Sequence, residues 1–229
     1  MPKITIAIDG YSSTGKSTLA RQLAGALGYV YIDTGAMYRA ITLYALREGL
    51  VNGSPDAAGL ASRLPELEVG FEVNPESGRS EVVLNGVNEE KAIRTLEVSR
   101  RVSKIAALGP VREKLVKLQR QMSRDGGVVM DGRDIGTVVL PDADLKIFMT
   151  ASPEIRAARR YKELLERGDE VSYTDVLENV RERDYLDSHR EIAPLRKAAD
   201  AIEFDNSDMG LEEQFDRIHS RALQVISNK

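Results

Sequence analysis

The sequence predicts a three-layer α/β fold in which helices cover both faces of a five-stranded parallel sheet. Two observations predict it. Short apolar strands alternate with amphipathic helices along most of the chain, and a glycine-bounded loop joins the first strand to the first helix. A third pattern, short strands separated by turn residues, indicates a small antiparallel insert. With 229 residues, 42% of them hydrophobic and 30% charged, the chain is long enough for one such domain with insertions.

Five apolar segments supply the strands of the predicted parallel sheet. They are expected at residues 3–9, 29–33, 127–131, 145–150 and 201–205. The first helix is expected from Lys16 to Leu27. The second is expected to begin at Thr34 as its cap, because apolar residues at helical spacing follow it.

Turn residues place the antiparallel insert at 66–88, where Asn85-Gly86 is a tight-turn signal between short strands. Gly109-Pro110 separates two helices, because proline cannot continue a preceding helix. Those two helices are expected at 95–108 and 110–124, and three more at 153–167, 173–189 and 211–226.

The composition argues against several classes of protein. No run reaches the roughly 20 apolar residues of a membrane span, and the first residues are too mixed for a signal peptide. The absence of cysteine fits a reducing compartment. A net charge of −4 argues against a general nucleic-acid binder. We therefore expect a cytoplasmic protein with no membrane or nucleic-acid partner.

A phosphate-binding loop follows the first strand. Gly10, Gly15, Lys16 and Ser17 complete the pattern G-x-x-x-x-G-K-[ST] between a strand and a helix. Glycines let backbone N–H groups curl around a phosphate, and the helix adds its positive end. Lysine supplies a positive charge, and the serine hydroxyl a ligand for Mg²⁺. The nucleotide-contacting residues expected here are Gly10, Tyr11, Ser12, Ser13, Thr14, Gly15, Lys16, Ser17 and Thr18.

A second anion site is predicted from two further segments. Arg39 lies in the first turns of the helix that begins at Thr34. Asp131, Arg133 and Asp134 come at the carboxyl end of a strand, where open α/β sheets bind ligands. Asp131 is placed to hold the water shell of the metal that Ser17 binds. No Asn-Lys-x-Asp guanine loop occurs, so phosphoryl transfer to a second anion is favoured over GTP hydrolysis.

Four separated motifs resemble those of bacterial cytidylate kinases: "DTGAMYRAI", "IRTLEVSRRVSKIAALGPVREKL", "MDGRDIGT" and "IAPLRKAADAI". The resemblance implies ATP-dependent phosphorylation of CMP and dCMP in pyrimidine nucleotide metabolism, with Mg²⁺, by a P-loop protein that acts as a monomer. It also implies a three-part division. The P-loop core would comprise residues 1–34, 101–152 and 191–229, the NMP-binding insert 35–100, and the helical lid 153–190.

The resemblance implies a role for each matched residue. CMP would be bound by Thr34, Arg39, Ser103, Arg112, Arg133, Asp134, Arg183, Asp187 and Arg190. Arg156 and Arg160 would join the loop in binding ATP, and the catalytic residues would be Lys16, Arg133, Arg159 and Arg183. A carboxylate and an arginine complement the cytosine edge, whereas uracil reverses its donors and acceptors; a buried site therefore rejects UMP.

The lid leaves alternatives open. Arg183, Asp187 and Arg190 stand at helical spacing, which is typical either of ion pairs or of a substrate-contacting face. Spacing does not decide which of Arg156, Arg159 and Arg160 reaches phosphate. Two functional alternatives also stay open, a kinase for UMP or AMP and a nucleotide-gated binding module without transfer activity.

Overall fold

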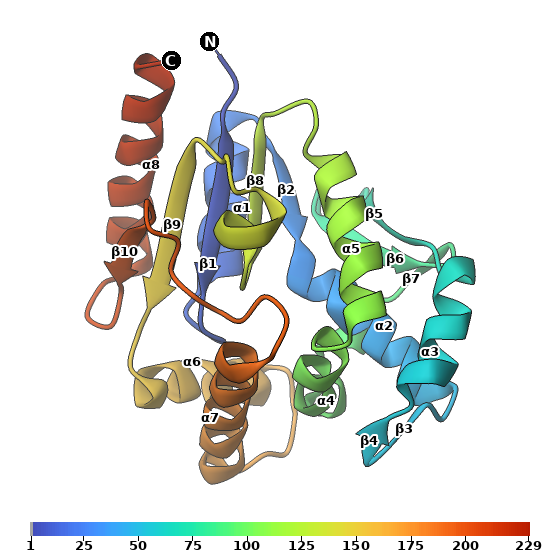
Figure 1. Cartoon of the computed structure of the whole chain (residues 1–229). Helices are drawn as coiled ribbons and strands as arrows, with labels where there is room; N and C mark the ends of the chain where they lie inside the picture. Colours follow the sequence, from blue (N-terminus) through green and yellow to red (C-terminus); the bar gives the residue numbers. More distant parts are fainter. Residues whose placement is uncertain (1) are drawn as a thin grey trace. The chain divides into compact units, whose positions relative to one another are not determined.

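The computed structural model describes residues 2–229 and forms two compact units (Figure 1). The first unit runs to Ile32 and resumes at Ser123, and the second comprises Asp33–Met122. Within the described residues, no helix is long and apolar enough to cross a membrane. The predicted three-part division into core, insert and lid stays a prediction.

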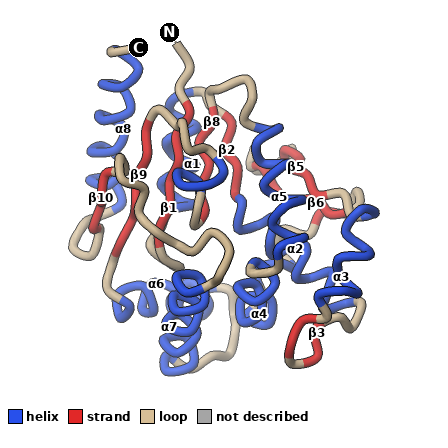
Figure 2. The backbone as a smooth tube through the Cα atoms, viewed as in Figure 1, coloured by secondary structure: helices blue, strands red, loops and turns tan. Residues whose placement is uncertain are grey.

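The first unit is built on a five-stranded parallel sheet, which confirms the predicted fold class. Its strand order is β10–β9–β1–β8–β2, so the first strand of the chain lies at the centre (Figure 2). The strands are β1 (Thr5–Gly10), β2 (Val30–Asp33), β8 (Val128–Gly132), β9 (Leu145–Thr150) and β10 (Ile202–Asp205).

Strand β1 pairs with both β8 and β9, for example Ile6 with Val129 and with Leu145. Two helices, α1 (Lys16–Leu27) and α8 (Leu211–Ser227), share a buried apolar core with the central strands. Leu23 and Ile218 are among its buried residues. Because β1 is central and buried, the loop that leaves its carboxyl end starts from a fixed position.

The helices α6 (Pro153–Glu166) and α7 (Tyr173–His189) pack against each other through Ala157, Leu164, Val176 and Val180. Arg190 is the residue after α7, and its backbone is extended (φ −62°, ψ 145°). The expectation that Arg190 shares one helix face with Arg183 and Asp187 is therefore wrong. Pro194 follows within a few residues, and helices commonly end shortly before a proline.

The second unit contains a three-stranded antiparallel sheet, β5 (Val69–Val73), β6 (Ser80–Leu84) and β7 (Val87–Asn88), which confirms the predicted insert. Its longer helices are α2 (Thr34–Arg47), α4 (Leu96–Ala106) and α5 (Gly109–Met122). The sequence did not predict the short hairpin of β3 (Val51–Asn52) and β4 (Ser54–Pro55) or helix α3 (Ala57–Arg63).

Helix α2 begins differently from the prediction. Asp33 is its N-cap, and the Asp33 carboxylate accepts a hydrogen bond from the backbone N–H of Ala36 (2.8 Å). Thr34 is already the first helical residue, so its expected role as cap is wrong. A carboxylate at this position satisfies a free backbone donor and interacts favourably with the helix dipole.

Arg94 fixes the charge of that cap. Its guanidinium donates to Asp33 at 2.9 Å and to Glu90 at 2.6 Å. Burial by itself raises the pKa of Asp33, but the charges of Arg94 and Arg39 outweigh it and lower that pKa to about 2. At a pH above the pKa that Asp33 has in the unfolded chain, the ionised cap therefore stabilises the folded state. This contribution is lost as the pH falls toward 2.

We expect Gly10→Ala to destabilise the fold strongly. Gly10 has φ +148°, and an added Cβ would lie 2.1 Å from the carbonyl oxygen of Met149 in the paired strand β9. The backbone of β9 cannot move away without breaking its strand pairing. We therefore expect the free energy of unfolding to fall by about 3 kcal/mol or more, which urea unfolding measures. Gly25→Ala is the control, because nothing lies within 4 Å of its added Cβ and α1 gains a better helix former. A loss below about 1 kcal/mol for Gly10→Ala would contradict the steric argument.

Asp33→Asn tests the charged cap. Asparagine caps helices about as well as aspartate, so the substitution removes mainly the interaction with the arginines. Because the pKa of Asp33 is lowered to about 2, we expect Asp33→Asn to reduce the free energy of unfolding by about 2 kcal/mol at pH 7. This reduction shrinks toward zero as the pH falls to 2. Urea unfolding at pH 7, 4 and 2.5 measures it. Asp56→Asn, at the N-cap of α3, is the control. A loss independent of pH would show that the arginines are not its cause.

Candidate functional site

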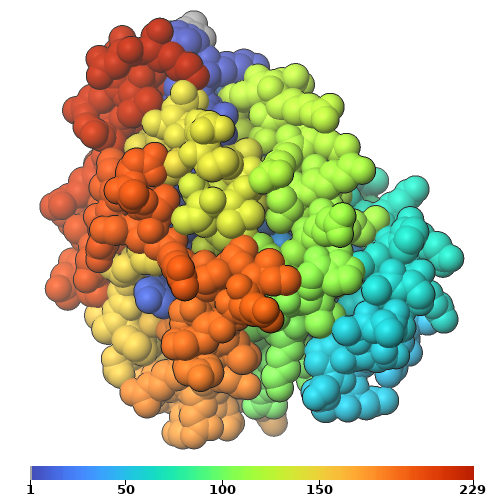
Figure 3. Space-filling view, viewed as in Figure 1, coloured from blue at the N-terminus to red at the C-terminus, as the bar shows by residue number. Residues whose placement is uncertain are grey.

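The phosphate loop joins the buried end of β1 to the start of α1 in the first unit. Its backbone turns through positive φ at Ser13 (60°) and Gly15 (89°). Gly15 is the N-cap of α1 and supplies no side-chain acceptor to the helix start. In Figure 3, one small blue area of the N-terminal part of the chain is visible among yellow and orange segments of the same unit. The loop therefore presents a helix N-terminus suited to an anion.

Lys16 is the central cation of this site. Its Nζ donates to the carbonyl oxygen of Tyr11 at 2.7 Å, and its side chain is buried. Burial lowers the pKa of Lys16 well below its ordinary value, and the positive charges of Arg133 and Arg183 lower it further. Bringing an anion to these cations would offset their mutual repulsion.

Arg183 shows the same excess of positive charge. Burial, followed by the charge of Arg133, lowers the pKa of Arg183 to about 10. Within the first unit, α7 and the segment after β8 thus bring two predicted catalytic arginines close to the predicted catalytic lysine. Buried cations that repel one another are typical of a site for a polyanion.

A hydroxyl and a carboxylate suited to magnesium lie together beside the loop. Ser17 Oγ donates to Asp131 Oδ2 at 2.8 Å, and the hydroxyl of Tyr31 donates to Asp131 Oδ1 at 2.9 Å. Oxygen donors of this kind are those that Mg²⁺ prefers, usually with several waters retained. The two residues predicted to bind metal therefore fit it. Among residues 2–229, no group of three or more histidine, cysteine or carboxylate ligands forms a dedicated metal cluster.

Two ion pairs connect the predicted acceptor residues of the first unit. Arg133 Nε lies 2.8 Å from Asp187 Oδ2, and Arg190 Nη2 lies 3.1 Å from Asp134 Oδ1. Asp187 and Arg190 thus form ion pairs with Arg133 and Asp134, which lie outside the pattern of Arg183, Asp187 and Arg190. Each pair nonetheless joins the segment after β8 to the end of α7, so the structure gathers residues that the sequence separates by more than fifty positions.

The three lid arginines have different surroundings. Arg156 is buried, donates to the carbonyl oxygen of Ser12 (3.1 Å) and pairs with Asp184 (2.6 Å). Arg159 donates to Asn206, and Arg160 pairs with Glu163 at 2.8 Å. Arg156 therefore supports the phosphate loop directly.

Asn206 is a site residue that the sequence did not reveal. Its fully buried amide donates to the carbonyl oxygen of Thr14 in the phosphate loop and to Gln214 of α8, both at 2.7 Å. Its Oδ1 accepts from Arg159 at 3.1 Å. The only sequence signal was its position directly after the last strand. Asn206 thus links the loop, α6 and α8.

The second unit holds the other predicted acceptor residues. Thr34 is buried at the start of α2, where the charge of Arg39 acts on the cap carboxylate of Asp33. Arg112 is buried, donates to the carbonyl oxygen of Ala106 and lies 5.7 Å from the ring centre of Tyr38.

Ser103 is also buried, and among residues 2–229 its Oγ finds no hydrogen-bond partner. A buried hydroxyl without a partner is costly unless a ligand supplies one. This observation favours the predicted role of Ser103 in contacting a polar ligand.

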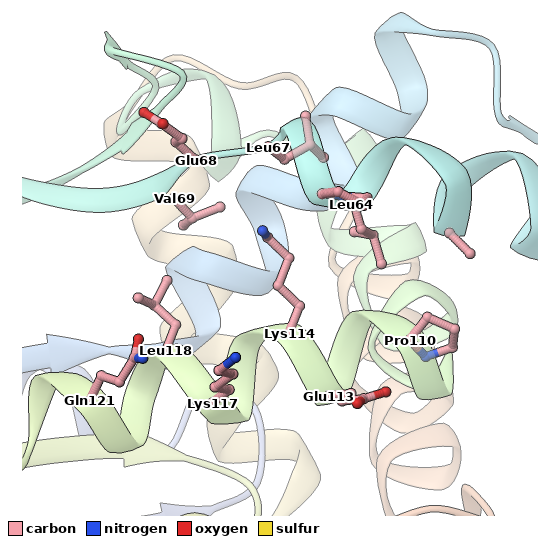
Figure 4. A pocket seen from close by; sticks show the side chains of 12 residues that line it. Leu64, Leu67, Glu68, Val69, Pro110, Glu113, Lys114, Lys117, Leu118 and Gln121 are labelled. Carbon is pink, nitrogen blue, oxygen red and sulfur yellow. The ribbon is translucent and has the colours of Figure 1, made fainter.

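A separate cavity of about 640 Å³ lies in the second unit, along one side of α5 (Figure 4). It is lined by Ala61, Leu64, Pro65, Leu67, Glu68, Val69, Pro110, Glu113, Lys114, Lys117, Leu118 and Gln121. None of the predicted site residues is among them. The cavity is therefore distinct from the sites described above.

The chain is similar to cytidylate kinases over nearly its whole length. Residues 6–224 match the family model described as cytidylate kinase. The chain is 56% identical to a cytidylate kinase of Bacteroides thetaiotaomicron, with 99% of each chain covered. It is 57% identical to one of Flavobacterium psychrophilum, with 100% of each covered. The chain belongs to the cytidylate kinase family.

Proposed function

We propose that the chain transfers the γ-phosphoryl group of ATP to CMP and dCMP, giving ADP with CDP or dCDP. The observation that carries the proposal is the gathering of the buried Lys16 and Arg183 around the half-buried Arg133, whose positive charge lowers the pKa of both. Family membership over residues 6–224 supports the nucleotide monophosphate as acceptor. Two polyanionic substrates require such a concentration of positive charge.

The transfer itself depends on positioning and charge neutralisation. An oxygen of the acceptor phosphate forms a bond to the γ-phosphorus while the bond to the oxygen between the β- and γ-phosphates breaks. Lys16, Arg133 and Arg183 neutralise charge on the transferring group, with Arg159 as the fourth proposed catalytic residue. The acceptor oxygen is already ionised, so no general base is needed.

Mg²⁺ is proposed at Ser17 and Asp131, where it would neutralise charge on the ATP phosphates when bound. The Ser17 hydroxyl and the Asp131 carboxylate, which would hold the ion and its water shell, already lie 2.8 Å from each other. Tyr31 holds the other carboxylate oxygen. That contact fixes the orientation of Asp131.

The acceptor contacts are proposed for the residues that the resemblance to cytidylate kinases assigns to CMP. Arg39 and Arg133 would bind the phosphate of CMP, and Thr34 would support them. Ser103, Arg112 and Asp134 would bind the cytosine edge, with Arg183, Asp187 and Arg190 completing the set. The unpartnered hydroxyl of Ser103 and the buried guanidinium of Arg112 support this assignment. Binding would exchange the ion pairs of Arg133 and Arg190 for contacts with substrate.

On the ATP side, residues 10–18 would bind the phosphates, with Arg156 and Arg160 near them. Closure of 155–190 over ATP and of 35–100 over CMP would exclude water, which competes as acceptor. We further propose a cytoplasmic monomer without nucleic-acid or membrane partners, which the net charge of −4 supports.

An ADP-release assay with Mg-ATP tests the proposed function. We expect fast turnover with CMP and dCMP, slow turnover with UMP, and little with AMP, GMP, dTMP or no acceptor. UMP would leave the polar groups of a cytosine site mismatched, which costs orders of magnitude in specificity. Better turnover with another base would remove Ser103, Arg112 and Asp134 as cytosine contacts. Tight ATP binding without turnover would instead identify a binding module.

Asn206→Ala tests the support of the phosphate loop. The variant loses the contacts to Thr14, Gln214 and Arg159, so we expect the KM for ATP to rise about tenfold, while the KM for CMP stays within about twofold. Steady-state kinetics with each substrate varied in turn measure both. Asn52→Ala, which removes an exposed side-chain hydrogen bond in the second unit, is the control. An equal rise in both constants would refute a loop-specific role.

A further inference from the structure

We propose that Asp9 is a positioning residue for the acceptor nucleotide, because its carboxylate holds the turn that follows Arg133 and Asp134. This inference rests on the proposed assignment of those two residues to CMP. Asp9 lies near the carboxyl end of β1, one residue before the phosphate loop.

Two hydrogen bonds connect Asp9 to the turn. Its Oδ1 accepts from the backbone N–H of Ile135 and its Oδ2 from that of Gly136, both at 2.8 Å. These residues open the π-helical turn Ile135–Val139, directly after Asp134. Each carboxylate oxygen thus holds one amide. Together they fix both the position and the rotation of the peptide that follows the acceptor-binding pair.

The surroundings make this contact specific. Asp9 is 4% exposed, and burying a carboxylate is costly unless hydrogen bonds compensate it. Burial raises the pKa of Asp9 to about 7, the two amide bonds and Lys16 act to lower it, and Asp134 acts to raise it. An apolar residue would avoid that cost at this position if only core packing mattered. The carboxylate is therefore explained by the two amides that it holds.

The turn has little room to move elsewhere. A Cβ added to Gly136 would lie 3.4 Å from Asp9 Oδ2 and 3.1 Å from Cδ of Lys146. On the other side, Asp134 is held by Arg190 through its carboxylate. Asp9 thus holds the backbone of Ile135 and Gly136, and Arg190 holds the side chain of Asp134. A change at Asp9 is thus expected to reach Arg133 and Asp134 first, before the phosphate loop.

The experiment compares Asp9→Asn with the parent chain. Asparagine keeps the shape but has one acceptor oxygen, so one of the two amides loses its partner. We expect the KM for CMP to rise about tenfold, the cost of roughly one buried hydrogen bond, with the KM for ATP within about twofold. Hydrogen exchange at the amides of Ile135 and Gly136 should accelerate by a similar factor.

Asp144→Asn is the matched control. Asp144 Oδ2 accepts from the backbone N–H of Thr5 (2.7 Å), the same chemistry at the opposite end of β1. It should leave both KM values unchanged. A second variant, Gly136→Ala, crowds the turn while keeping Asp9 and should raise the KM for CMP alone, with Gly25→Ala as its control. The test therefore does not depend on the folding of Asp9→Asn.

The proposal would be overturned if Asp9→Asn and Gly136→Ala, the two turn variants, changed the KM values for CMP and ATP equally. It would also be overturned if neither turn variant changed either value. Unchanged exchange at Ile135 and Gly136 in Asp9→Asn would overturn it as well. Arg133→Gln separates this failure from failure of the proposed function. If Arg133→Gln raises the KM for CMP and the turn variants do not, only the role of Asp9 is wrong. If Arg133→Gln has no effect, the assignment of Arg133 to the acceptor is wrong.

Discussion

The buried positive charge beside the phosphate loop is the constraint on which the first unit depends. Lys16, Arg133 and Arg183 come from a helix start, a loop after β8 and the interior of α7, and the charge of Arg133 lowers the pKa values of Lys16 and Arg183. Burying like charges close together costs free energy through desolvation and mutual repulsion. Such an arrangement requires a fold that holds the side chains in place and an anion that compensates their charge. The central position of β1 supplies the first condition, and nucleotide phosphates supply the second.

Carboxylates at the same edge of the sheet offset part of this charge. Asp187 pairs with Arg133, Asp134 with Arg190 and Asp184 with Arg156. These pairs orient the three arginines. Desolvation of buried charges offsets much of the attraction within such pairs, so their net contribution to stability is small.

The loop itself is held by side chains from other elements of the first unit. Arg156 donates to the carbonyl oxygen of Ser12, and Asn206 donates to that of Thr14. Asp9 in turn holds the neighbouring turn at Ile135 and Gly136. Side chains from α6 and the end of β10 therefore hold the phosphate loop, and a side chain from β1 holds the turn after Asp134. Pre-organisation of this kind lowers the cost of binding two charged substrates together.

Local patterns were sufficient for most of the fold and for the substrate class. Alternating strands and helices predicted the parallel sheet, and turn residues predicted the antiparallel insert, because each depends on residues near one another in sequence. The short segments 51–55 and 57–63 were missed, since so few residues carry little periodic signal. The spacing of glycines, Lys16 and Ser17 defined the phosphate loop. The resemblance to cytidylate kinases then supplied the acceptor.

Tertiary structure decided which side chains support the site. Asn206 lies 192 residues from Thr14, and Asp9 lies more than a hundred from Gly136, so no local pattern joins them. The cap of α2 was assigned to Thr34 because both Asp33 and Thr34 are good capping residues, and only the backbone distinguishes them. The sequence by itself determined the chemistry of the loop and the class of its ligands. Only the folded chain decided how that chemistry is held, because burial and partner choice depend on residues that are distant in sequence.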